Sequence, residues 1–302
     1  MTPRGALAQG FRSIRQRPLL LLIEIAWRWC FGLFMLAAIA LSTAVYLRLF
    51  PLSPDDLRAL HSMAPPLVAA VLAKILIAGG PLLLRIVSVL VPLLLMSWAL
   101  LASAGRSAVL ARLPEFSLRP KFATSVALHF WRAVLFFFAV LAILVIIVGA
   151  GFAGVALTHR MEPDLRITSA ILFPGLLIVG FLWSVANWYL SAAVLFADAR
   201  KGMKLALAQS YRFSQRNRRE LMQSAIAMSA FRLVLLLAIT IVSLLVVVPL
   251  AGAPAAFVLV LLLVLTLLYF ALSDFLSLAR LLAYVFLIKR EQDGPPFIPT
   301  ES

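Results

Sequence analysis

The sequence predicts an all-α, polytopic membrane protein that crosses the bilayer six times. Of its 302 residues, 64% are hydrophobic and only 13% are charged, whereas soluble domains carry about 25% charged residues. Six segments stay apolar over the roughly 20 residues that a helix needs to span a bilayer. The formal charge of +15 comes from short basic clusters between these segments. Because no continuous basic patch is present, this charge indicates membrane orientation, and no nucleic-acid partner is predicted.

Each predicted span is defined by its apolar length. The six spans are Leu19–Leu47, Pro81–Ser103, Ser125–Leu157, Ser169–Ala197, Leu221–Leu250 and Ala255–Leu278. The first is longer than the apolar region of a secretory signal, about 7–15 residues, so it is expected to remain as a membrane helix. A further run, Pro65–Ala78, is too short to cross. It is predicted to be a helix that is either re-entrant or at the membrane surface.

Charge sets the predicted orientation. If both termini lie on one side, that side receives 18 of the 27 Lys and Arg residues and the opposite side receives 6. Because basic residues are enriched in cytoplasmic loops, both termini are predicted to be cytoplasmic, in a multi-pass protein of the cell inner membrane. Residues 1–18 are expected to form a cytoplasmic segment, 19–290 a single six-helix membrane domain and 291–302 a disordered cytoplasmic tail.

A weak internal repeat predicts that the spans form three helical hairpins. The three odd-numbered spans carry an aromatic residue followed by arginine, at Trp27-Arg28, Trp131-Arg132 and Phe231-Arg232. The three even-numbered spans end in a small residue followed by arginine, at Gly105-Arg106, Ala199-Arg200 and Ala279-Arg280. A chance coincidence of common dipeptides is the alternative.

A basic amphipathic helix is predicted after the fourth span, between Asp198 and Glu220. At helical spacing its apolar side consists of Met203, Ala206, Leu207, Ser210 and Phe213. Such a helix lies along a membrane surface with its apolar side among the headgroups. Its basic residues are therefore expected to contact anionic lipid: Arg200, Lys201, Lys204, Arg212, Arg216, Arg218 and Arg219. A solvated charged loop is the alternative.

The same stretch, FADARKGMKLALAQSYRF, resembles a group of bacterial six-helix proteins that includes the membrane domain of some glycerophosphodiester phosphodiesterases. In that group the loop reads acidic, basic, Ala-Leu, Ser and a large apolar residue. The matching positions here are Asp198, Arg200/Lys201, Ala206-Leu207, Ser210 and Phe213. The resemblance implies an integral membrane protein. Because these 302 residues contain no phosphodiesterase domain, it implies no hydrolase activity.

Polar residues within the spans are the usual indication of a functional site in a membrane protein. Six are candidates for an intramembrane polar cluster: Glu24, Arg28, Arg132, Arg232, Asp274 and Asn187. In one interpretation the arginines reach to the interface, Asp274 pairs with an arginine, and Asn187 forms an interhelical hydrogen bond. In the other, the charged cluster binds an anionic lipid headgroup at the inner mouth of the bundle.

Catalytic signatures are lacking, since there is no glycine-rich phosphate loop, HExxH or GxSxG motif. Cys30 is the only cysteine, so no intramolecular disulfide can form. His61, His129 and His159 lie far apart in the sequence and are expected to be interfacial. No catalytic residue, metal or cofactor is therefore predicted.

The expected function is that of a non-enzymatic envelope scaffold or lipid-interacting protein. A permease for a lipid-like or hydrophobic solute is the alternative, because Pro92 and Pro174 should kink two spans. An intramembrane enzyme is the weakest hypothesis. The expected partners are membrane lipids, anionic at the cytoplasmic face, and neither a protein partner nor an oligomeric state is predicted.

Overall fold

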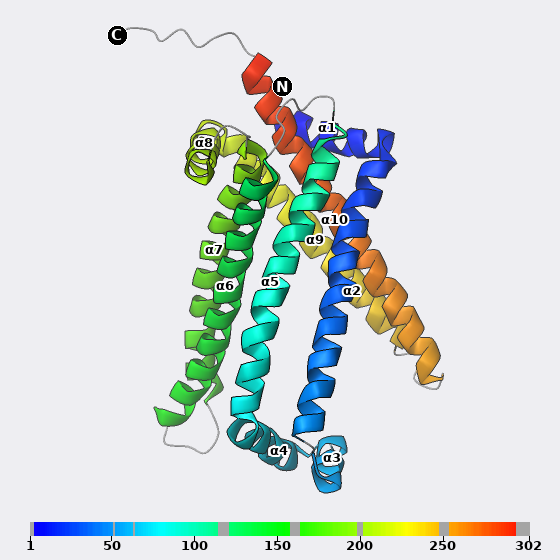
Figure 1. Ribbon diagram of the computed structural model, residues 1–302, viewed down its shortest axis with the longest axis vertical. Coiled ribbons are helices and arrows are strands. Elements are labelled where there is room, and N and C mark those ends of the chain that lie inside the picture. Colours follow the sequence, from blue (N-terminus) through cyan, green and yellow to red (C-terminus); the bar gives the residue numbers. More distant parts are fainter. Residues whose placement is uncertain are drawn as a thin grey trace.

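The computed structural model describes residues 3–50, 52–62, 64–113, 121–157, 164–197, 202–247 and 254–293. In these ranges all regular secondary structure is helical, and six helices are long and apolar enough to cross a membrane. Figure 1 shows these helices side by side, with shorter helices at both ends. The prediction of an all-α protein with six membrane spans is therefore confirmed.

Each spanning helix covers most or all of one predicted apolar segment. The six are α2 (Pro18–Leu49), α5 (Gly80–Leu110), α6 (Phe122–Ala156), α7 (Leu165–Ala193), α9 (Arg218–Val247) and α10 (Ala255–Asp293). A short 3-10 turn, η1 (Val194–Phe196), follows α7. Two helices, α5 and α10, continue well beyond the expected ends at Ser103 and Leu278. The expected end of the fifth span, Leu250, lies outside the described residues.

Consecutive spans pair as the repeat predicts, because α2 contacts α5, α6 contacts α7 and α9 contacts α10. The hairpins are joined by contacts of α5 with α6 and of α2 with α10. Both α5 and α7 continue through their internal prolines, Pro92 and Pro174. On α6, the small residues Ala150 and Gly154 are buried near the connection to α7, and Gly154 lies close to Thr168 of α7.

The connection between α2 and α5 contains two short helices, α3 (Pro54–His61) and α4 (Pro65–Ala78). Ser53 begins α3 with a capping box that it forms with Asp56. Lys74 on α4 then forms an ion pair with Asp56, at an Nζ to Oδ2 distance of 2.5 Å. The segment Pro65–Ala78 forms one helix of 14 residues and is not among the six helices long enough to cross a membrane. Figure 1 shows α3 and α4 across the end of the bundle that is remote from both termini.

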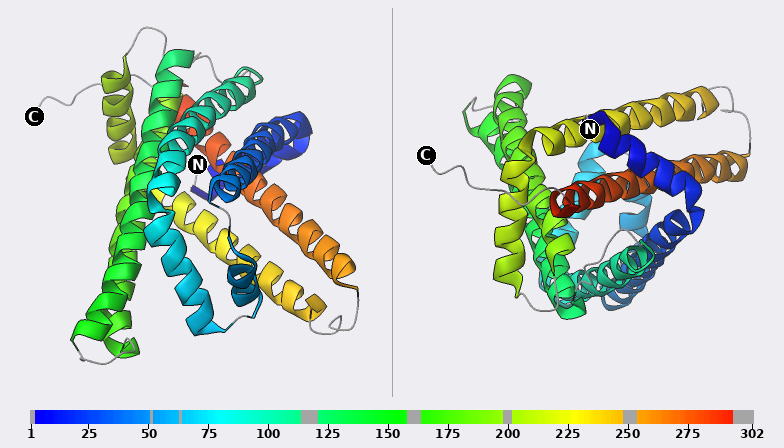
Figure 2. Two further views of the ribbon diagram at one scale, coloured as in Figure 1. Left: turned by 60° about the horizontal axis from the view of Figure 1, so that its bottom comes forward. Right: turned by 90° about the horizontal axis from the view of Figure 1, so that it is seen from above.

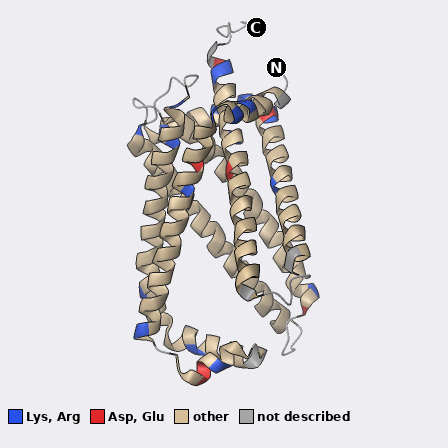
Figure 3. Ribbon diagram, turned by 90° about the vertical axis from the view of Figure 1, so that its right-hand side faces the viewer, with Lys and Arg blue, Asp and Glu red and all other residues tan. Residues whose placement is uncertain are grey.

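At the opposite end lie α1 (Pro3–Gln16) and α8 (Met203–Arg216), which Figure 2 shows extending across the bundle when it is viewed from above. We call this the α1/α8 end. It also carries both termini and most of the basic residues, while a smaller charged group accompanies α3 and α4 (Figure 3).

The N-terminal helix α1 packs against the bundle at this end. A Cβ added at Gly10 would lie 2.7 Å from the Ala279 carbonyl oxygen, so α1 crosses α10 in close contact. The Phe11 and Phe275 rings also stack, with centroids 5.6 Å apart. At the other terminus α10 continues to Asp293, and the predicted disorder of the tail beyond it lies outside the described residues.

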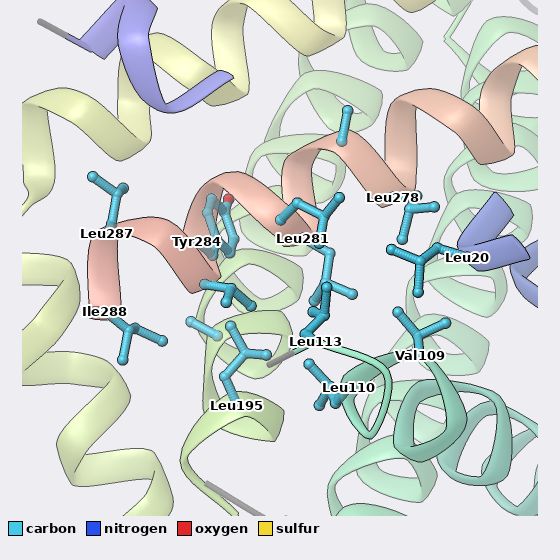
Figure 4. Close-up of a cluster of buried hydrophobic side chains, with 14 of the residues drawn as sticks. Leu20, Val109, Leu110, Leu113, Leu195, Leu278, Leu281, Tyr284, Leu287 and Ile288 are labelled. Carbon is cyan, nitrogen blue, oxygen red and sulfur yellow. The ribbon is translucent and has the colours of Figure 1, made fainter. Parts of the chain in front are cut away.

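The main hydrophobic core lies at the α1/α8 end. Its side chains surround the C-terminal half of α10, with Leu20 from α2 and Val109 and Leu110 from α5 among them (Figure 4). Towards the middle of the spanning helices, most large apolar side chains are exposed. This pattern is expected of a membrane protein, because lipid tails solvate apolar side chains as well as protein does.

Candidate functional site

Five arginines from five different spanning helices line one cavity of about 250 Å³. They are Arg28 on α2, Arg106 on α5, Arg132 on α6, Arg232 on α9 and Arg280 on α10. All five belong to the dipeptides of the internal repeat, whose sixth arginine, Arg200, lies outside the described residues. The repeat therefore brings one kind of side chain from each hairpin to a common place. We call this site the arginine cavity.

The remaining spanning helix, α7, contributes Asn187 and Ser191 to the wall. Every spanning helix therefore contributes to the cavity. It lies within the bundle, since Arg28 and Arg132 each follow the first residue of their helix by ten positions, or about 15 Å at the rise of an α-helix. This depth places the Cα atoms of both arginines between the helix ends and the middle of the spans.

Glu24 is fully buried beside the cavity and holds two of the arginines. Its Oε1 lies 2.6 Å from Arg28 Nη2 and 3.1 Å from Arg106 Nη2. Its Oε2 accepts a hydrogen bond of 3.0 Å from Trp27 Nε1. The Trp27 ring in turn lies against both guanidinium groups, at 5.1 Å from Arg28 Cζ and 6.0 Å from Arg106 Cζ.

Asp274 joins the third hairpin to this network. Its Oδ1 lies 2.9 Å from Arg28 Nη1, so the predicted pairing of Asp274 with an arginine is present. Nearby on α9, Arg232 donates a hydrogen bond of 2.6 Å to the Ser277 hydroxyl of α10. Of the six residues expected to cluster, Arg28, Arg132, Arg232 and Asn187 line the cavity, and Glu24 and Asp274 form ion pairs with its arginines.

Positive charge exceeds negative charge at this site. Within the described part of the chain, Arg132, Arg232 and Arg280 form no ion pair, and Arg28 and Arg106 share Glu24 and Asp274. The five arginines therefore leave a formal excess of three positive charges. Buried charges without a counter-charge are costly, so the cavity is suited to an anion.

Several buried polar atoms of the wall also lack a hydrogen-bond partner among the described residues. They are Arg106 Nη1, Arg232 Nε, Asn187 Oδ1 and both ring nitrogens of His129. Buried polar groups are normally hydrogen-bonded, and exceptions indicate a functional role. Because guanidinium groups bind phosphate and carboxylate oxygens through paired hydrogen bonds, the N–H donors of Arg106 and Arg232 fit an oxyanion.

Three basic residues of the wall, Arg106, Arg280 and His129, were not predicted to belong to the site. Both arginines follow the apolar segments and were assigned to loops, but α5 and α10 continue past them. His129 was expected at the interface, yet it is 2% exposed and lines the cavity. The small-residue–arginine dipeptides of the repeat were the signal that could have identified both arginines.

The predicted lipid contacts on α8 form a separate surface. Lys204, Arg212 and Arg216, with Arg218 and Arg219 at the start of α9, are exposed, whereas Arg200 and Lys201 lie outside the described residues. The opposite side of α8 does not enter the headgroups as expected. It packs on α6, α7 and η1, where Ala206 and Phe213 are buried and Ser210 Oγ donates a 2.8 Å hydrogen bond to the Tyr189 carbonyl.

Other reactive side chains do not gather elsewhere in the described residues. No group of three His, Cys, Asp or Glu side chains there could hold a metal ion. Cys30 is exposed on α2, His61 is exposed on α3, and His159 is outside the described residues. The arginine cavity is therefore the main candidate site.

Comparison with known proteins adds no further assignment, because no protein-family model, curated protein or solved structure matches this chain.

Proposed function

We propose that this protein is a lipid-interacting component of the bacterial cell inner membrane that holds an anionic group, of the phosphate type, in the arginine cavity. The observation that carries the proposal is the convergence of five arginines on a cavity with only two carboxylates in contact with them. A bound oxyanion would balance the excess charge and provide acceptors for the partnerless donors of Arg106 and Arg232.

A binding or scaffold role, without catalysis, is part of the proposal. The two carboxylates at the site, Glu24 and Asp274, are both engaged by Arg28. This arrangement suits charge balance and the joining of helices better than proton transfer. The resemblance to the six-helix group that includes phosphodiesterase membrane domains stays a prediction and supplies no activity.

The proposal also includes an orientation, with the α1/α8 end and both termini in the cytoplasm. Its support is the positive-inside rule, together with the exposed basic residues of α8 beside this end. In that orientation the basic face of α8 is available to anionic headgroups of the cytoplasmic leaflet. Reporter fusions within the Asp198–Glu220 connection test it, and a periplasmic signal would overturn it.

The experiment for anion binding compares the full-length protein in nanodiscs of phosphatidylcholine alone and of phosphatidylcholine with phosphatidylglycerol. We expect the anionic lipid to raise the melting temperature of the wild type. Arg132→Gln should reduce this rise by half or more, because Arg132 lines the cavity without an ion-pair partner among the described residues. The double substitution Arg212→Gln with Arg216→Gln, on the exposed face of α8, is the matched control.

Two results would contradict this proposal. One is an equal melting temperature in both lipid mixtures. The other is a rise that survives Arg132→Gln but disappears in the α8 control, since it would assign the stabilisation to surface charge.

A permease for a lipid-like solute is the second candidate, because a cavity is present where all six spanning helices meet. A permease must move its substrate between leaflets, whereas a scaffold only holds it. Transfer of a fluorescent phosphatidylglycerol across proteoliposome membranes distinguishes the two. Transfer that depends on Arg132 would favour the permease.

A further inference from the structure

A second pocket, of about 470 Å³, adjoins the arginine cavity and shares Arg132 and Trp98 with it. Apart from Arg132, its wall is entirely apolar or aromatic and comes from α2, α5, α6 and α7. Met35, Leu94 and Val140 are representative of its aliphatic part, and Phe136 and Trp183 of its aromatic part. We call it the apolar pocket.

The apolar pocket extends from the arginine cavity towards the middle of the spanning helices. On α6, Phe136 and Val140 follow Arg132, and on α2 Met35 follows Arg28, in both cases away from the α1/α8 end. Helices α5 and α7 run in the opposite direction. On these two helices the residues that line the pocket therefore come earlier in the sequence than those that line only the cavity. Val140 lies eight residues beyond Arg132, which corresponds to about 12 Å along α6.

On the other side, the arginine cavity borders the main hydrophobic core. Leu110, Leu195 and Leu281 belong both to the cavity wall and to the core at the α1/α8 end, and Figure 4 shows them around α10. Along the axis of the bundle, the order is therefore packed core, polar cavity and apolar pocket. A polar chamber that continues into an apolar one fits a molecule with a charged end and a hydrocarbon end.

We infer that the anion in the arginine cavity is the headgroup phosphate of a membrane lipid, with an acyl chain of the same molecule in the apolar pocket. This inference rests on the proposed function and specifies its ligand. The polar end lies nearer the α1/α8 end and the chain points to the middle of the spans, as in a lipid of the adjacent leaflet. A soluble anion would use the cavity alone.

The experiment measures binding to the full-length protein in neutral detergent by native mass spectrometry. The two probes are phosphatidic acid and glycerol 3-phosphate, which carry the same phosphate with and without acyl chains. Val140→Trp fills the apolar pocket and leaves every cavity arginine in place. Val145→Trp is the matched control, because Val145 lies on the same helix, is 63% exposed and is not part of the wall.

Val140→Trp should weaken phosphatidic acid binding about tenfold or more, since overfilled apolar sites tolerate added volume poorly. It should leave glycerol 3-phosphate binding unchanged, and Val145→Trp should leave both unchanged. Equal phosphatidic acid binding by Val140→Trp and Val145→Trp would overturn the inference. If Arg132→Gln still weakened the binding of both probes in that case, the proposed anion site would remain without the acyl-chain pocket. If Arg132→Gln weakened the binding of neither probe, the proposed function itself would fail.

A second measurement leaves the pocket lining nearly intact. Phosphatidic acid with dibrominated acyl chains should quench the fluorescence of Trp183 in the pocket wall. The quenched fraction should fall in Trp183→Phe and persist in Trp131→Phe, since Trp131 is half exposed on the outside of α6 and is not part of the wall. Quenching that disappears only in Trp131→Phe would place the lipid on the outer surface and overturn the inference.

Discussion

Arg28 Nη1 lies 2.9 Å from Asp274 Oδ1, although the two residues are 246 positions apart in the chain. The ion pair joins α2 of the first hairpin to α10 of the third. Arg28 also contacts Glu24 on its own helix, four residues away. One guanidinium group therefore connects a carboxylate of the first hairpin with a carboxylate of the third, beside the arginine cavity.

Asp274→Asn should have opposite effects on stability and on anion binding. Without the carboxylate charge, Arg28 loses its link to α10, and the free energy of unfolding should fall by about 1–3 kcal/mol. The cavity gains one net positive charge, so the stabilisation by phosphatidylglycerol should increase. Melting curves in nanodiscs with and without this lipid measure both effects. Asp55→Asn, in the exposed pair with Arg58, should change neither, and a smaller lipid effect in Asp274→Asn would contradict the charge argument.

Glu24→Gln should be the most destabilising conservative change at the site. The carboxylate is fully buried and contacts Arg28, Arg106 and Trp27. Its neutralisation leaves two buried guanidinium groups poorly compensated, which costs about 3–5 kcal/mol in comparable buried pairs. Chemical denaturation in mixed micelles measures this loss. Glu220→Gln, which breaks the more exposed pair with Arg290, should lower the free energy of unfolding by about 1 kcal/mol or less. An equal decrease in the two variants would show that Glu24 contributes no more than an exposed ion pair.

Gly105→Ala should distort the wall of the arginine cavity. A Cβ at this position would lie 2.2 Å from Trp27 Cδ1, so the Trp27 ring, which lies against Arg28 and Arg106, would have to move. Overpacking of this kind costs about 1–3 kcal/mol. Gly180→Ala is the control, because a Cβ there meets nothing within 4 Å, and alanine favours a helix over glycine by up to about 1 kcal/mol. The melting temperature should therefore fall in Gly105→Ala and rise in Gly180→Ala. Equal changes in the two variants would disprove the close contact.

The Asp56 carboxylate between α3 and α4 should titrate at low pH. Its hydrogen bond from Lys74, followed by those involving Ser53, lowers the pKa of Asp56 from 3.8 to about 2. Because the folded pKa lies below the unfolded one, this group contributes stability that is complete above pH 3.8 and is lost as the pH falls towards 2. An NMR titration of the carboxyl carbon should give this midpoint. Lys74→Gln should raise the midpoint, and an unchanged value would exclude Lys74 as the main cause.

Apolar length was sufficient to predict the six spans, and the repeat of dipeptides predicted their pairing as hairpins. Apolar length did not locate the helix ends, because hydropathy falls at the first charged residue while backbone hydrogen bonding continues. Arg106 and Arg280 were therefore placed in loops, although α5 and α10 carry both into the cavity. The repeat contained the missing information, but a pattern of dipeptides does not reveal where three hairpins converge.

Periodicity correctly grouped the residues on each side of α8, yet it could not identify what the apolar side contacts. A face formed by Ala206, Ser210 and Phe213 can meet lipid or protein. The structure shows protein contact, because the small side chains of Ala206 and Ser210 allow close approach to α7. The exposed basic face alone retains the properties expected of a membrane-surface helix.

The close crossing of α1 and α10 at Gly10 and Ala279 has a consequence for biogenesis. The spanning helices α2, α5, α6, α7 and α9 lie between α1 and α10 in the chain order. The two helices can therefore pack together only after the intervening helices have been synthesised and inserted, so this end of the bundle matures after them.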